Sequence, residues 1–244
     1  SGKTSVAVFA RQIFAAAGHK AASLGTIGTV TSAGANYGGL TTPDPVSLHQ
    51  TLARLAHDGI THAALEASSH GLDQRRLDGV RLAAAGFTNL GRDHLDYHAD
   101  VEDYLAAKLR LFDTLLPEGK PVVLEPDAPY ADRVMAVARD RGLPLFTVGD
   151  GGKDLALKDI RHDGFMQVLS LETEDGPREI RLPLAGRFQV SNALIAAGLA
   201  IAGGVKTDAA LEALESLEGA PGRLELVGES DDGALVFVDY AHKP

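Results

Sequence analysis

The sequence predicts an α/β fold in which a mostly parallel sheet is flanked by helices, with an added antiparallel hairpin region. Short apolar runs alternate with segments of helical periodicity along most of the chain, the pattern of parallel strands wrapped by helices. Residues 164–184 differ, because two alternating runs flank the turn sequence "EDG" and predict an antiparallel hairpin. The tetrapeptide "GKTS" at the head of the first predicted helix fits the tail of a phosphate-binding loop, so the predicted architecture is P-loop ATPase-like.

Six helices are predicted from the spacing of apolar residues, and residues suited to caps support two of their ends. Gly18 suits the end of the first helix, because glycine tolerates the left-handed conformation that often follows a helix. Asp100 suits the start of the third, because its side chain can accept a hydrogen bond from the first turn. The predicted helices span residues 2–18, 44–59, 100–116, 128–142, 188–204 and 207–217.

Further strands are predicted where apolar runs are bounded by turn residues. They lie within residues 20–30, 61–68, 80–90, 120–126, 143–149 and 234–241. The first is expected to lead into a glycine-rich loop through Gly39, and residues 91–100 are expected to be loop. The last is expected to be a buried strand that opens a second domain after a linker at residues 218–222.

Composition excludes several classes of protein. A net charge of −10 argues against a general nucleic-acid or anionic-membrane surface, although a few local donors can still hold a phosphate. The absence of cysteine excludes disulfides, thiolate metal sites and a cysteine nucleophile. No apolar run is long enough to span a bilayer and no signal peptide is evident. We expect a cytoplasmic protein and, from the abrupt ends of the sequence, a fragment of a longer chain.

The third predicted helix places an ammonium group on its apolar face. The stripe consists of Val101, Tyr104, Leu105, Phe112 and Leu115. Lys108 falls on the same stripe. One interpretation is that its stem packs while its charge reaches water. The other is that burial favours the neutral amine, which can add carbon dioxide and become a carbamate with oxygen ligands for Mg²⁺.

Two positions suit phosphate and metal chemistry. In "GKTS", Lys3 would reach the terminal phosphates of a nucleotide and the Thr4 hydroxyl would meet Mg²⁺. Glu66 ends the strand predicted at residues 61–68, at the sheet edge where open α/β proteins bind ligands. A carboxylate there could hold Mg²⁺ directly or through water, or it could be an ordinary solvated glutamate.

Three other motifs have both functional and structural interpretations. "GRDHLDYH" contains His94 and His98, whose spacing would suit zinc in a helix; solvated loop histidines or one histidine ligand to a second Mg²⁺ are the alternatives. Asn192 opens an apolar helix as a cap or as an amide that contacts a nucleotide base. The hydroxyls of Thr41 and Thr42 lie in a turn and are structural or substrate-binding.

Taken in order, these segments resemble the Mur ligase family of ATP-dependent amide-forming enzymes in peptidoglycan synthesis. The motifs are GKTS, TTP, EASSHGL, TNLGRDHLDYH, YLAAKLRLF, GRFQVSNALIAA, APGRLE and DYAHKP. "EASSHGLDQRR" with "DHLDYH" is similar to the branch that adds the third residue, meso-diaminopimelate or L-lysine, to UDP-N-acetylmuramoyl-L-alanyl-D-glutamate. The resemblance implies a central ATP-binding domain at residues 1–221, truncated within its phosphate loop, and the start of a C-terminal ligase domain at residues 222–244.

The resemblance also implies roles for individual residues. Nucleotide contacts are implied for Gly2, Lys3, Thr4, Asn192, Arg223 and Asp239. Contacts with the UDP-muramoyl-dipeptide are implied for Thr41, Thr42, Ser68, Gln74 and Arg76. Two Mg²⁺ ions are implied, with ligands from Thr4, Glu66, His94 and a carbamate on Lys108. Lys3, His94 and Lys108 would be catalytic, a monomer is expected, and no nucleic acid or membrane partner is implied.

The sequence departs from the family pattern at a few positions and leaves alternatives open. Gln189 and Glu125 stand where asparagine is usual, Ala128 where aspartate is usual, and Leu40 where asparagine is common. Gln189 affects the expected adenine contacts, Glu125 and Ala128 leave the role of their loop open, and Leu40 removes one possible substrate contact. Another Mur ligase, a folylpolyglutamate synthetase or a P-loop binding module without ligase activity remain alternatives, and the isolated fragment is expected to be inactive.

Overall fold

The computed structural model describes residues 2–91, 97–230 and 232–240, and it contains a four-stranded sheet near the start of the chain. The strand order in this sheet is β3-β2-β1-β4. Its strands are β1 (Ala21–Gly25), β2 (Gly28–Thr31), β3 (Gly34–Asn36) and β4 (His62–Leu65). Strands β1 and β4 are parallel, with Ala22 opposite Ala63, whereas β1, β2 and β3 form an antiparallel meander.

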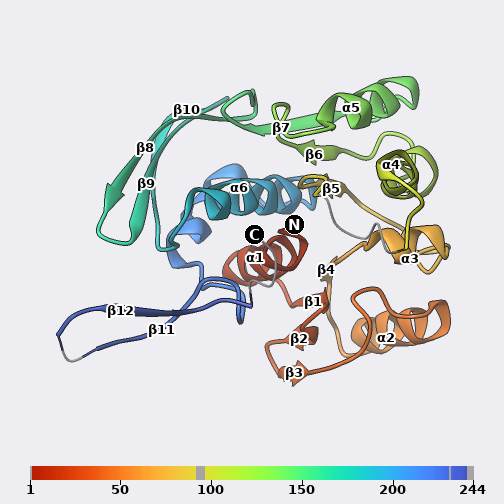
Figure 1. The fold of residues 1–244 in the computed structure, drawn as a ribbon, viewed down its shortest axis with the longest axis horizontal. Coiled ribbons are helices and arrows are strands. Elements are labelled where there is room, and N and C mark those ends of the chain that lie inside the picture. Colours follow the sequence, from red (N-terminus) through yellow and green to blue (C-terminus); the bar gives the residue numbers. More distant parts are fainter. Residues whose placement is uncertain (1, 92–96, 231, 241–244) are drawn as a thin grey trace.

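A six-stranded sheet forms the opposite side of the molecule (Figure 1), with strand order β10-β9-β8-β7-β6-β5. Its strands are β5 (Ala85–Phe87), β6 (Val122–Leu124), β7 (Leu145–Gly149), β8 (Leu155–Asp163), β9 (Met166–Thr173) and β10 (Gly176–Leu182). Strands β5 to β8 are parallel and β8 to β10 are antiparallel. Thr173 pairs with Gly176 around the "EDG" turn, which confirms the predicted hairpin. The parallel strands β5 to β8 confirm the predicted α/β architecture with a mostly parallel sheet.

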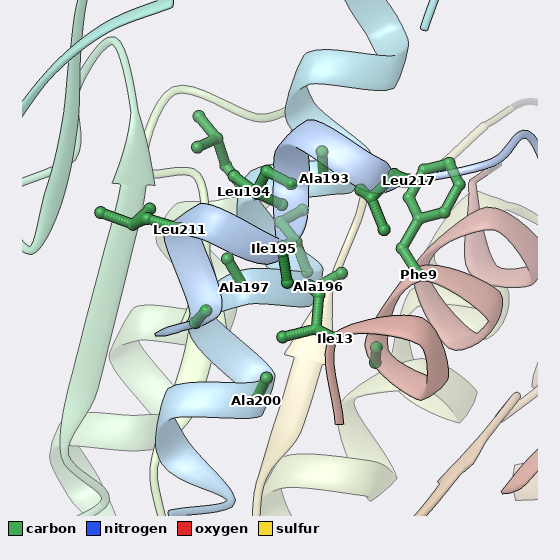
Figure 2. Packing of buried hydrophobic residues seen from close by; sticks show 14 of the residues in the cluster. Phe9, Ile13, Ala193, Leu194, Ile195, Ala196, Ala197, Ala200, Leu211 and Leu217 are labelled. Atoms are coloured by element: carbon green, nitrogen blue, oxygen red, sulfur yellow. The ribbon is translucent and has the colours of Figure 1, made fainter. Parts of the chain in front are cut away.

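Two helices lie between the sheets and supply most of the main core. The helices and helical turns are α1 (Lys3–Ala16), α2 (Pro45–His57), α3 (Ser69–Asp73), α4 (Val101–Arg110), η1 (Leu111–Leu115), α5 (Ala131–Asp140), α6 (Arg187–Ala202), α7 (Thr207–Ala213) and η2 (Leu214–Ser216). Helix α6 packs against α1, and Figure 2 shows Ile13 of α1 facing Ala196 of α6, with Leu217 beside Phe9. Small side chains along α6 let the two helix backbones approach closely. In the described residues, every helix is too short or too polar to cross a membrane.

The edges of two strands face one large cavity. In the part of the chain that the structure describes, β4 pairs only with β1, and β5 pairs only with β6. A cavity of about 730 Å³ is lined by both strands and by α1, α4 and α6. We call it the inter-sheet cavity. Most side chains that line it are apolar, but Lys3, Glu66 and Lys108 also contribute.

Several predicted elements differ from the structure. The single strand predicted within residues 20–30 is two strands, β1 and β2, because Gly28 (φ +99°) allows a tight turn, and the glycine-rich segment predicted as loop contains β3. Helix α3 and strand β8 were not predicted. A register shift between Leu157 and Asp159 interrupts the alternation of β8, which removes the usual sequence signal for a strand.

The two ends of the helix predicted at residues 100–116 behave differently. Asp100 caps α4 as predicted, accepting a hydrogen bond from the Asp103 amide at 2.8 Å. Beyond Arg110, however, the backbone continues as the π-helical turn η1 rather than as α-helix. Near the other end of the chain, β11 (Glu225–Glu229) and β12 (Leu235–Val238) form a separate antiparallel hairpin (Figure 1). The prediction that this last strand is buried is wrong, because β12 pairs only with β11 among the described residues and its side chains are half-buried or exposed.

Candidate functional site

The head of α1 lies beside the end of β4. Gly2 adopts the left-handed conformation (φ +83°), which lets the chain turn into the helix, and its carbonyl accepts from the Val6 amide at 2.9 Å. Lys3 and Thr4 follow in the first turn, where unpaired backbone amides and the helix dipole favour anions. The Thr4 hydroxyl donates to Glu66 Oε2 at 3.0 Å, so the hydroxyl of the predicted phosphate loop and the carboxylate after β4 meet.

Glu66 is buried and held from two sides. Its backbone continues the pairing of β4 with β1 through a 2.9 Å bond from the Glu66 amide to the Leu24 carbonyl. The Thr26 amide donates to Glu66 Oε1 at 2.8 Å. A Cβ at Gly25 would lie 1.9 Å from that oxygen, so only glycine leaves room for the carboxylate. The solvated interpretation of Glu66 is therefore wrong, since the side chain is enclosed at the sheet edge.

Lys108 is buried on the inner face of α4. The residue is only 8% exposed, and its predicted stripe faces inward with it, so the interpretation in which its charge reaches water is wrong. Its Nζ lies 3.5 Å from the carbonyl oxygen of Asn89 and 5.2 Å from the centroid of the Tyr104 ring. It lines the inter-sheet cavity together with Lys3 and Glu66. Three of the predicted functional side chains, from α1, β4 and α4, thus reach one cavity.

The predicted substrate-binding residues form a polar cluster next to Glu66. Thr42 Oγ1 donates to the backbone carbonyl of Glu66 at 2.8 Å and lies 3.0 Å from Ser68 Oγ. Ser68 in turn caps α3 through a 3.1 Å bond from the Gly71 amide. The Arg76 guanidinium donates to the Thr42 carbonyl at 2.8 Å. These contacts fix the loop before α2 against the start of α3.

Hydrogen bonds extend this cluster at both ends. Arg76 Nε donates to Gln74 Oε1 at 3.1 Å, and Gln74 Nε2 donates to the Tyr97 hydroxyl at 3.1 Å. At the other end, Thr41 Oγ1 lies 3.0 Å from Thr26 Oγ1. The predictions did not include Thr26, although its position directly after β1 and a glycine is a signal that could have found it. Thr26 therefore connects the Glu66 carboxylate with the hydroxyl turn.

Only one of the two histidines of "DHLDYH" lies among the described residues. His94 lies outside the described residues, so its predicted role as a metal ligand stays a prediction. His98 is buried, its Nδ1 lies 3.1 Å from Asp103 Oδ2, and its ring stacks on Tyr104. The interpretation of His98 as a solvated loop histidine is therefore wrong. No group of three or more histidines, aspartates and glutamates suited to a metal occurs among the described residues, so the zinc alternative gains no support.

A chain of hydrogen bonds connects the predicted nucleotide residues. Asn192 Nδ2 donates to Gln189 Oε1 at 3.0 Å, and Gln189 Nε2 donates to the Arg223 carbonyl at 3.1 Å. The Leu224 amide donates to Asp239 Oδ2 at 3.1 Å. A Cβ at Gly2 would lie 2.3 Å from Asn192 Oδ1, so the asparagine side chain lies directly beside the phosphate-loop glycine.

A second cavity, of about 390 Å³, extends from Gly2 along the start of α6, and we call it the α6 cavity. Its other lining residues are Thr88, Asn89, Glu125, Asp127, Ala128, Pro129, Asp150, Arg187, Phe188, Ser191, Asn192 and Ile195. Several of these follow the carboxyl ends of β5, β6 and β7, the edge at which α/β sheets bind ligands. Its volume is within the range of small-molecule sites. The head of α1 therefore borders both cavities.

A comparison with known families identifies the fold. The family described as "Mur ligase middle domain" matches residues 1–200. The chain belongs to the Mur ligase family. The Mur ligase resemblance of the ordered motifs is thereby confirmed.

Similar proteins point to one branch of the Mur ligases. The chain is 59% identical to the UDP-N-acetylmuramoyl-L-alanyl-D-glutamate–2,6-diaminopimelate ligase of Agrobacterium fabrum and 60% identical to that of Mesorhizobium japonicum. Each match covers 100% of this chain and 50% of the relative. The chain thus spans about half the length of the curated relatives it matches.

Solved structures of Mur ligases share this fold. A structure titled as a UDP-N-acetylmuramoyl-L-alanyl-D-glutamate–2,6-diaminopimelate ligase matches with a TM-score of 0.87 and 32% identity, over 100% of this chain and 49% of that one. MurF from Acinetobacter baumannii matches with a TM-score of 0.76 at 21% identity, over 100% of this chain and 49% of that one. A mutant of FPGS from L. casei matches with a TM-score of 0.75 at 18% identity, over 100% of this chain and 66% of that one. The last two are similar in fold alone.

Proposed function

We propose that this chain is the central ATP-binding part of a ligase that joins a diamino acid to UDP-N-acetylmuramoyl-L-alanyl-D-glutamate. The observation that carries the proposal is the hydrogen bond from Thr4 to Glu66, a carboxylate that lines one cavity together with Lys3 and Lys108. Relatives at 57–60% identity are named 2,6-diaminopimelate ligases, which favours 2,6-diaminopimelate over L-lysine as the third residue. The domain boundary near residue 221 is part of the proposal.

The residues are proposed to act in two ways, by positioning the substrates and by neutralising the charge of the phosphates. Lys3 would hold the terminal phosphates of ATP while the γ-phosphoryl group passes to the side-chain carboxylate of the D-glutamate. The amine of the incoming residue attacks the acyl phosphate, the new C–N bond forms, and phosphate leaves with the electrons of the C–O bond. The hydroxyls of Thr42 and Ser68 and the guanidinium of Arg76 would hold the muramoyl-dipeptide beside Glu66.

The donor set fits Mg²⁺. Glu66 and Thr4 present hard oxygen atoms 3.0 Å apart at the head of α1, and Mg²⁺ prefers a few such ligands together with phosphate oxygens and water. When bound there, the metal would neutralise charge that develops on the transferred phosphoryl group. His94 and Lys108 are the proposed ligands of a second ion.

Lys108 is proposed to act as a carbamate. The nitrogen of its neutral amine can bond to the carbon of CO₂ and lose a proton. The product would be an anion with two oxygen atoms that could serve as metal ligands. This converts a buried cation of α4 into a ligand that suits Mg²⁺.

The α6 cavity is proposed to hold the nucleotide base. It begins at Gly2, where phosphates would bind, and Asn192 lies on its wall. Arg223 and Asp239 would contact the nucleotide from the start of the next domain. The net charge of −10 favours small substrates held by local donors over nucleic acid, and we further propose a cytoplasmic monomer.

The test uses the full-length ligase that contains these residues and measures ADP release with ATP, the UDP-muramoyl-dipeptide and 2,6-diaminopimelate. Replacing Lys108 by alanine is expected to abolish most activity, and added acetate should restore part of it by supplying a carboxylate.

Glu66→Gln should lose activity by orders of magnitude, because a ligand charge is removed from an otherwise similar side chain. Lys120→Ala, at an exposed lysine before β6, is the control and should be unaffected.

The alternatives give different results in the same assay. A nucleotide-binding module would release no ADP in response to the amine, and a folylpolyglutamate-type ligase would respond to a folate substrate instead. A UDP-muramoyl substrate of another peptide length would reveal another Mur ligase. Full activity of Lys108→Ala without acetate would contradict the proposed carbamate.

A further inference from the structure

Glu125 holds a fixed position on the wall of the α6 cavity. It follows directly on β6, and its side chain is half-buried. A Cβ at Gly149 would lie 2.7 Å from Glu125 Oε1, so the carboxyl packs on the bare backbone at the end of β7. Ser191, in the first turns of α6, hydrogen-bonds to the same carboxyl. Three elements therefore fix Glu125 at one place on the cavity wall.

This wall of the cavity is rich in hydrogen-bond acceptors. Asp127 and Asp150 line the cavity beside Glu125. One nitrogen of the Arg187 guanidinium donates to Asp150, and the amide of Asn192 donates to Gln189, so part of the donor capacity of this wall is engaged within the protein. A ligand that binds against Glu125 is therefore favoured if it brings its own N–H donors.

Other residues that line the cavity suit a flat ring. Phe188 is 53% exposed and lines the cavity, as do Ile195, Ala128 and Pro129. An aromatic ring and small apolar side chains bind the face of a planar heterocycle well, and they leave its polar edge to be matched elsewhere. A purine with an exocyclic amine has both the flat face and the N–H donors that this cavity requires.

We propose that Glu125 is a specificity-determining residue that selects an amino-bearing purine by accepting a hydrogen bond from its exocyclic amine. The proposal rests on the proposed function, in which the α6 cavity holds the nucleotide base. The proposed phosphate and metal contacts involve other residues, so this contact with the base is additional to them.

The electrostatics of Glu125 are consistent with this role. Burial raises the pKa of its carboxyl, the Ser191 hydrogen bond and the charge of Arg187 lower it, and Asp150 and Asp127 raise it again. Burial therefore costs this carboxyl part of its hydration, and an N–H donor from a ligand would compensate for that loss. Both protonation states keep an oxygen atom that can accept, so recognition does not depend on one of them.

The experiment compares ATP with purine riboside 5′-triphosphate, which lacks only the exocyclic amine. Equilibrium binding of each nucleotide is measured by calorimetry with the full-length ligase. Wild type should bind ATP about tenfold or more tightly than the analogue, the scale of one hydrogen bond to a charged group. Glu125→Ala should bring the two affinities to about the same value by weakening ATP alone. Glu125→Gln, which keeps an acceptor oxygen, should retain part of the preference.

The control is Glu118→Ala, an exposed glutamate before the opposite end of β6, which should keep the wild-type ratio. Equal binding of both nucleotides to wild type, or an unchanged ratio in Glu125→Ala, would overturn the role of Glu125 and leave the proposed function intact. If wild type bound neither nucleotide, the proposed function would fail and this inference with it. The ratio separates recognition from structural damage, because misfolding would weaken both nucleotides together.

Discussion

At the scale of single residues, Glu125 makes the stability of the protein depend on pH. Its pKa is raised, chiefly by burial, so the folded state holds the proton more tightly than the unfolded state does. No cost arises below the unfolded pKa, where both states are protonated. The destabilisation grows as pH rises from that value and is complete above the folded pKa.

Glu125→Gln should therefore become more stable than wild type as the pH is raised from about 4 to 8, because the amide has no charge to bury. Thermal denaturation at several pH values measures the difference, which should be smallest at the acid end. Glu118→Gln, at an exposed carboxylate, should follow wild type throughout. A constant offset between Glu125→Gln and wild type at every pH would show that ionisation of Glu125 is not the cause.

Candidate functional residues could be predicted where a charged side chain lies in an apolar sequence pattern. Lys108 was found because it interrupts an apolar stripe, and Glu66 because it ends an apolar strand; both are buried. The contacts of Thr26 and Glu125 were missed, although the position of Thr26 directly after β1 and a glycine was a signal. Each contact joins residues distant in sequence: the Thr26 amide after β1 donates to Glu66 after the neighbouring strand β4, and Glu125 packs on Gly149.

At the scale of secondary-structure elements, the π-turn η1 that follows α4 is held by a side chain from the end of α5. The pairing in η1 departs from that of an α-helix. The guanidinium of Arg141, just after α5, donates to the carbonyls of Phe112 at 2.9 Å and Leu116 at 3.0 Å. Arg141 thus supports the turn that follows Lys108.

Arg141→Ala should lower the free energy of unfolding by about 1–3 kcal/mol, because two charge-assisted hydrogen bonds to backbone carbonyls are lost. Urea denaturation measures the change. Arg139→Ala, at an exposed arginine of the same helix, is the matched control and should cost much less. Equal costs for the two variants would mean that the contacts of Arg141 contribute nothing specific to stability.

The elements that were predicted and those that were missed differ in where their side chains lie. Helices α1 and α6 bury continuous apolar faces, so their periodicity is strong. Strands β2 and β3 bury little, and β8 is interrupted by its register shift, so neither gives a clear alternation. Sequence patterns indicate the core and are weak where an element is held by backbone pairing alone.

At the scale of the whole molecule, the inter-sheet cavity is bordered by strands β4 and β5, each of which has one edge that is unpaired within the described residues. Such edges pair readily with another extended chain. A peptide with alternating β-branched residues should therefore bind the 244-residue chain saturably and raise its melting temperature by several degrees. The same peptide with proline at its centre is the control. Equal effects of both peptides, or none, would show that the edges are not available for pairing.

The division between the sheets also separates two of the residues proposed to be functional. Glu66 belongs to the four-stranded side, whereas α4 packs with β5 and β6 in a separate apolar cluster and takes Lys108 with it. The distance between the Glu66 carboxylate and the Lys108 amine therefore depends on how far apart the two sheets lie. A compound that bound between the sheets and changed this distance would shift both proposed metal positions without contacting a metal ligand. Inhibitors could therefore be sought that bind in the inter-sheet cavity instead of competing with ATP.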